Sequence, residues 1–89
     1  MSAVQPIVVV ATIPVPTGWR YVFEEMPSIE RDVGAFTLTV GLDDGDWHWW
    51  LCPLGSGISV EHGEGVDMLD AIWQVLDALA RRLDGGGTQ

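Results

Sequence analysis

Positive charge is scarce in this chain of 89 residues, which contains four arginines and no lysine. Thirteen Asp and Glu residues give it a formal net charge of -9 at pH 7. Binding to nucleic acid needs clustered cations against the phosphates, and adhesion to an anionic membrane needs the same. The charge balance therefore argues against direct nucleic acid binding and against membrane binding. It favours either simple solubility or attraction to a basic protein.

Cysteine is nearly absent as well. Cys52 is the single cysteine, so no disulfide can form within the chain, which favours a reducing compartment. The apolar run at residues 7–13 is too short to span a bilayer. Residues 1–19 contain no Lys or Arg for the basic region of a secretory signal. We therefore expect a cytoplasmic protein, made in a bacterium or in a phage-infected host cell.

Motifs of catalysis and metal binding are also missing. The chain contains no G-x-S-x-G, no H-E-x-x-H and no glycine-rich phosphate loop with lysine. Acids near Cys52 would raise the pKa of its thiol and so oppose a nucleophilic role. The acids at 43–46 lack the spacing of an EF-hand loop, and His62, Glu64 and Asp67 form only a weak zinc pattern. We expect no enzyme activity, no metal and no cofactor.

What the chain does contain is enough apolar sequence for a core, with 47% apolar and 19% charged residues. One domain spanning residues 1–84 is expected, followed by a disordered tail at 85–89. Apolar and β-branched patterns predict strands at 6–13 and 19–24, joined as a hairpin. The polar segment 25–34 is expected to be a connection with room for one helical turn.

The cleanest period-two pattern is AFTLTVGL, at residues 35–42. Asp44-Gly45 suits a two-residue type I′ turn, so a strand at 46–52 is expected to return beside it. A further short strand is expected at 58–62. From residue 66 the apolar period changes to three and four, which predicts a long helix capped by Asp67 and terminated by Gly85.

These elements predict an α+β fold: a four- or five-stranded antiparallel sheet (meander) with one long C-terminal helix packed on one face. Packing of the helix at a sheet edge, or against a second copy, is the alternative. The predicted apolar stripe of the helix consists of Val66, Leu69, Ile72, Trp73, Leu76, Leu79, Ala80 and Leu83.

The hairpin register assigns the tryptophans of residues 43–52 to two faces. Because cross-strand partners share a face, Trp47 and Trp49 are expected to join the core beneath the predicted apolar stripe of the helix, which includes Trp73. Trp50 and His48 are expected on the opposite face, where Gly41 would leave a shallow open spot. The alternative is that another segment folds over Trp50 and buries it.

An accessible tryptophan among acids is typical of a protein-binding surface. We therefore expect a small acidic protein that blocks a larger, basic or nucleic-acid-binding partner, as an antitoxin, immunity protein or phage anti-defence inhibitor does. A structural or assembly subunit that acts through self-association, as a homo-oligomer, is the alternative. The expected partner-binding residues are Asp43, Asp44, Asp46, His48, Trp50, Asp67, Asp70 and Asp77.

Overall fold

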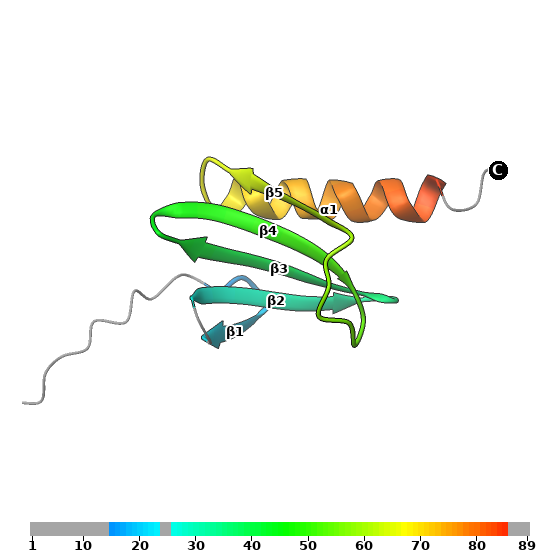
Figure 1. The fold of residues 1–89 in the computed structure, drawn as a ribbon, viewed down its shortest axis with the longest axis horizontal. Helices are drawn as coiled ribbons and strands as arrows, with labels where there is room; N and C mark the ends of the chain where they lie inside the picture. Colours follow the sequence, from blue (N-terminus) through cyan, green and yellow to red (C-terminus); the bar gives the residue numbers. More distant parts are fainter. Residues whose placement is uncertain (1–14, 24–25, 86–89) are drawn as a thin grey trace, which may run out of the picture.

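A five-stranded antiparallel sheet with one helix on one face forms the described part of the chain (Figure 1). The computed structural model describes residues 15–23 and 26–85. The strands lie in the order β1-β2-β3-β4-β5, so each pairs with its neighbour in sequence. The predicted α+β meander is confirmed. The elements are β1 (Arg20–Phe23), β2 (Pro27–Val33), β3 (Phe36–Asp43), β4 (Asp46–Pro53), β5 (Glu61–Gly65) and α1 (Met68–Gly85).

The predicted connection at 25–34 is wrong, because most of it forms β2 between β1 and β3. Ile29 and Val33 face the core side of the sheet, but Arg31 lies between them on the same side. This interruption makes the segment resemble a solvated loop in sequence. In the fold, pairing with strands on both sides stabilises a polar sequence as a central strand.

Other boundaries also differ from the prediction. The predicted strand at 6–13 lies outside the described residues, as do residues 86–89 of the predicted tail. The short strand expected at 58–62 begins later, at Glu61, because residues 54–60 form a loop after β4.

The β3–β4 hairpin has the predicted register. Asp43 pairs with Asp46, and Val40 pairs with Trp49. Asp44 and Gly45 occupy the turn with φ angles of 54° and 86°. Both values lie in the left-handed region that a type I′ turn requires at its two central positions. The turn chemistry therefore sets which indoles of β4 face the helix.

Trp49 joins β4, β5 and α1 at the centre of the core. Its side chain is 6% exposed, and its Nε1–H donates a hydrogen bond to Oε1 of Gln74 at 2.8 Å. The indole lies directly over Gly63 of β5, where an added Cβ would be 2.7 Å from Nε1. Glycine is therefore required at this position so that the ring can lie flat against the strand.

The start of α1 is held by reciprocal hydrogen bonds of the kind that cap helices. Oδ1 of Asp67 accepts the N–H of Asp70 at 2.8 Å, as the predicted cap requires. Oδ2 of Asp70 accepts the N–H of Val66 at 2.9 Å and also a bond from Nε2 of Gln74. Asp70 thereby connects the helix cap to Gln74, the partner of Trp49.

The prediction that Trp73 belongs to the core is wrong, because its side chain is 66% exposed. The buried arc of the helix is centred on Val75 and includes Ala71 and Ala78, which the predicted stripe omitted. These small side chains let the side of the helix that carries them pack closely on the sheet. Trp73 and Leu69 therefore face away from the sheet. The apolar stripe of the sequence is broader than the arc that the sheet covers.

The helix covers only part of the sheet. It packs closely on β3, β4 and β5, whereas in the described residues its backbone lies farther from β1 and β2. None of the described helical residues forms a segment long and apolar enough to cross a membrane.

Candidate functional site

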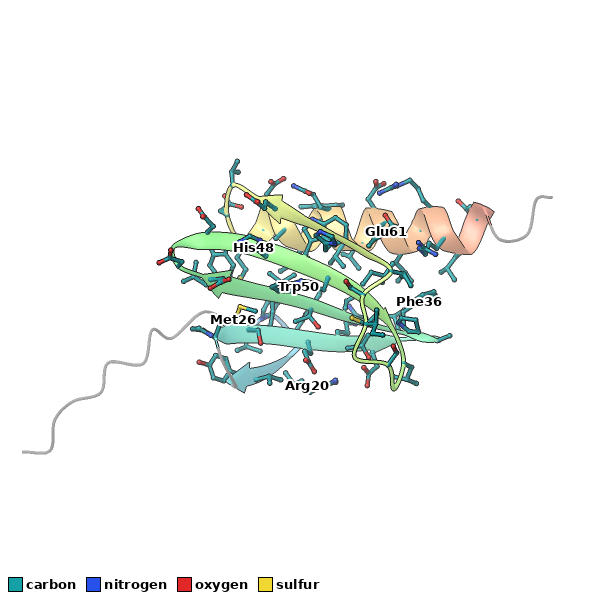
Figure 2. The ribbon with its side chains drawn as sticks, in the orientation of Figure 1. Arg20, Met26, Phe36, His48, Trp50 and Glu61 are labelled. Atoms are coloured by element: carbon teal, nitrogen blue, oxygen red, sulfur yellow. The ribbon has the colours of Figure 1, made fainter. Side chains whose placement is uncertain are left out.

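The sheet face opposite α1, the outer face, carries a polar row that includes one tryptophan, Trp50 of β4 (Figure 2). The strand registers align Arg20, Glu30, Thr39, Trp50 and His62 across all five strands. Cross-strand partners share a face, so these five side chains are neighbours on the outer face. The prediction that Trp50 points away from the core face is confirmed by this register.

Trp50 lies in a hollow of the outer face rather than in the interior. The side chain is half-buried and borders an open space of about 340 Å³. β2, β3 and β4 form the floor, and part of the loop after β4 forms a wall. The residues that border the hollow with Trp50 are Met26, Ser28, Glu30, Thr39, Cys52, Gly57 and Ser59.

His48 stacks on Trp50 along β4. The two ring centroids are 5.9 Å apart and the planes differ by 25°. The shallow open spot expected beside His48 is absent, because Gly41 is buried. An added Cβ at Gly41 would lie 3.2 Å from Sδ of Met26 and 3.2 Å from Cβ of Ser28. The accessible space is therefore beside Trp50.

An acidic cluster with one arginine borders the Trp50 hollow. Arg20 contacts Glu30 at 3.1 Å and Asp32 at 3.2 Å, through the same nitrogen. Hydrogen bonds from Thr37, at 2.8 Å, and from Arg20 lower the pKa of Asp32, and the two acids raise the pKa of Arg20. Glu30 thus already binds one guanidinium group at the edge of the hollow.

Cys52 also borders the hollow, with a half-buried side chain. Burial raises the pKa of its thiol, and the charge of Glu30 raises it further. The sequence predicted this direction from neighbouring acids, whereas burial is the larger cause. A thiol that stays protonated is a poor nucleophile, so the site gives Cys52 no catalytic activation.

The six predicted acids lie in two regions: five are at or near one end of the molecule, and Asp77 lies farther along α1. Asp43, Asp44 and Asp46 are exposed around the β3–β4 turn, at the same end of the molecule as the start of α1 (Figure 1). Asp67 and Asp70 lie near this end but are engaged in the helix cap.

Asp77 lies two helical turns beyond Asp70, with a 71% exposed side chain, and pairs with Arg81 at 3.1 Å. The structure therefore does not gather all six acids on one surface. Sequence reasoning also missed Glu30 and Met26, since both lie in or beside the segment interpreted as a connection. Recognition of β2 would have aligned Glu30 with Trp50.

No group of three His, Cys, Asp or Glu side chains in residues 15–23 and 26–85 is placed to hold a metal ion. Comparison with known protein families, curated proteins and solved structures found no match to this chain. The candidate site is therefore defined by its own geometry: an indole, a carboxylate and an open hollow on an uncovered sheet face.

Proposed function

We propose that this chain is a small acidic, non-enzymatic binding protein that blocks a basic or nucleic-acid-binding protein through its outer face. The observation that carries the proposal is the position of Trp50, half-buried at an open hollow of about 340 Å³ beside Glu30. An indole with one accessible side is a strong anchor for a partner side chain. Antitoxin, immunity and phage anti-defence proteins are the classes that match this description.

The chemistry of the hollow favours a cationic group. An aromatic face attracts Arg or Lys through its quadrupole, and a neighbouring carboxylate adds a charge-assisted hydrogen bond. The chain's own Arg20 already makes such a bond to Glu30 at 3.1 Å. A partner arginine that enters beside Trp50 would share or replace this contact. The proposed anchor of the partner is therefore an arginine or lysine side chain.

The acidic surface supports capture of such a partner from a distance. The net charge of -9 attracts a basic protein, and exposed acids at the β3–β4 turn lie at one end of the outer face. Long-range attraction raises the association rate, whereas the desolvated anchor limits dissociation. Action inside a bacterial or phage-infected cell is part of the proposal, supported by the unpaired Cys52.

The direct test uses an arginine-rich peptide as a probe, with a glutamine peptide of the same length as its control. Indole N–H signals of the full chain are followed by NMR during titration. The expected result is a salt-sensitive shift of the Trp50 signal, with binding weakened at least tenfold by Trp50→Ala and by Glu30→Gln. Arg20→Ala is expected to tighten binding, since it releases Glu30 and removes a positive charge.

Trp73→Ala is the matched control, because it removes an equally large indole from the helix. Equal weakening by Trp50→Ala and Trp73→Ala would contradict an outer-face site. In the native cell, affinity purification at low salt compares the wild type with Trp50→Ala. A basic protein retained only by the wild type would support the proposal, and recovery of no partner would count against it.

A further inference from the structure

The helix carries a second apolar surface that neither the core nor the Trp50 hollow uses. Leu69, Trp73 and Leu83 are 61%, 66% and 61% exposed, Ala80 is exposed, and Leu76 is half-buried at the margin of the core. These five residues, the helix stripe, form a single band on α1. Large apolar side chains gathered in one exposed band mark an interaction surface more often than scattered ones do.

The spacing of the helix stripe indicates a helical partner. Its residues follow one another at intervals of 4, 3, 4 and 3, so the three leucines are spaced by seven. This is the 3.5-residue period with which one helix packs along another. The band extends about 21 Å along the axis, from the rise of 1.5 Å per residue.

The order of side chains in the helix stripe is complementary to itself when reversed. If two copies of α1 run antiparallel with Leu76 at the two-fold axis, Leu69 of one copy lies opposite Leu83 of the other. Trp73 then lies within one residue of Ala80 of the other copy, about 1.5 Å along the axis, twice, so the largest side chain is beside the smallest. An interface of this symmetry uses the same patch on both subunits, as a closed dimer requires.

The surroundings of the stripe are compatible with a second copy. The flank that faces β5 is engaged within the monomer, where Arg82 contacts Glu61 at 2.8 Å and Gln74 bonds to Trp49. The stripe lies on the other flank of the helix, where Leu69, Trp73 and Leu83 keep more than half of their surface exposed. A second helix can approach these side chains.

We propose that two copies of this chain associate through antiparallel pairing of their α1 helices along the helix stripe. The proposal is independent of the outer-face site, which lies on the opposite side of the sheet. Each copy carries a charge of -9, so the two copies repel one another at low salt. Salt is expected to strengthen this dimer and to weaken binding of a basic partner, so the two associations are separable.

Analytical ultracentrifugation of the full chain tests the proposal. The expected result is a concentration-dependent species of twice the 9.7 kDa chain mass, increasing with salt. Trp73→Glu is expected to weaken association at least tenfold. Ile58→Glu is the matched control, since Ile58 is a 77% exposed apolar residue outside the helix. A monomer at every concentration and salt, or equal effects of the two variants, would overturn the proposal.

Cysteine cross-linking tests the orientation, in a Cys52→Ser background. With Leu69→Cys and Leu83→Cys together, oxidation is expected to form a covalent dimer. Leu69→Cys alone is expected to form no cross-link, because Leu69 of one copy is far from Leu69 of the other. The two positions are about 21 Å apart within one helix, too far for a disulfide inside one chain. Efficient cross-linking of Leu69→Cys alone would indicate parallel helices and overturn the antiparallel arrangement.

Discussion

Trp49 and Trp50 are adjacent in β4 and have opposite environments. Trp49 is 6% exposed, lies against Gly63 and donates a hydrogen bond to Gln74 of the helix. Trp50 is half-buried beside an open hollow, with Thr39 and His62 as its cross-strand partners. The surroundings of each ring therefore determine its solvent exposure. An indole is enclosed where a glycine makes room for it and a helix covers it, and it stays accessible where neither is present.

The largest expected difference between the two indoles is in stability. Trp49→Ala should lower the free energy of unfolding by about 3–5 kcal/mol, because it leaves a cavity and removes the bond to Gln74. Trp50→Ala should lower it by about 1 kcal/mol or less, since much of that ring keeps its contact with solvent. Urea unfolding followed by far-UV circular dichroism measures both. Equal losses would contradict the assignment of the two rings to different faces.

A smaller effect is expected from the glycine beneath Trp49. Gly63→Ala should cost about 1–3 kcal/mol, since the added Cβ would meet the indole at 2.7 Å and force it to move. Gly57→Ala is the matched control on the outer side, because nothing lies within 4 Å of a Cβ added there. Thermal unfolding of the two variants in parallel is the measurement. If Gly57→Ala proves as harmful as Gly63→Ala, close packing of Trp49 is not the cause.

The smallest effect concerns Cys52, next to Trp50 in the hollow. Burial, then Glu30, raises the pKa of the thiol, so the folded protein holds this proton to higher pH than the unfolded chain does. The resulting stabilisation is present below the unfolded pKa and is lost as pH rises through the folded pKa. Iodoacetamide should therefore alkylate the folded protein several-fold more slowly than the urea-unfolded protein. Equal rates would show that Cys52 is open to solvent.

The part of the fold that sequence predicts best is the β3–β4 hairpin. Asp44-Gly45 specifies both the turn type and the register, because few residues adopt left-handed angles. The strand β2 was missed because Arg31 interrupts its apolar face, and only its neighbours make it a strand. Its place between β1 and β3 is a long-range property that local alternation does not encode.

The same limit applies to the candidate site. The face of Trp50 followed from the turn, but the position of Glu30 in the same hollow depends on β2 and was not predicted. The assignment of Trp73 to the core failed because an apolar period does not say which arc of a helix meets the sheet. The two small residues Ala71 and Ala78 decide that arc, and they carry little weight in a hydrophobic pattern.

The order of the elements has a consequence for how the chain acquires its structure. All five strands pair with sequence neighbours, so the sheet can assemble through short loop closures, which are fast. The helix comes after them in the chain and supplies the cover for Leu38 and Leu51 of β3 and β4. Until α1 packs on it, the sheet presents a bare apolar surface, so docking of the helix is the step that protects this surface from aggregation.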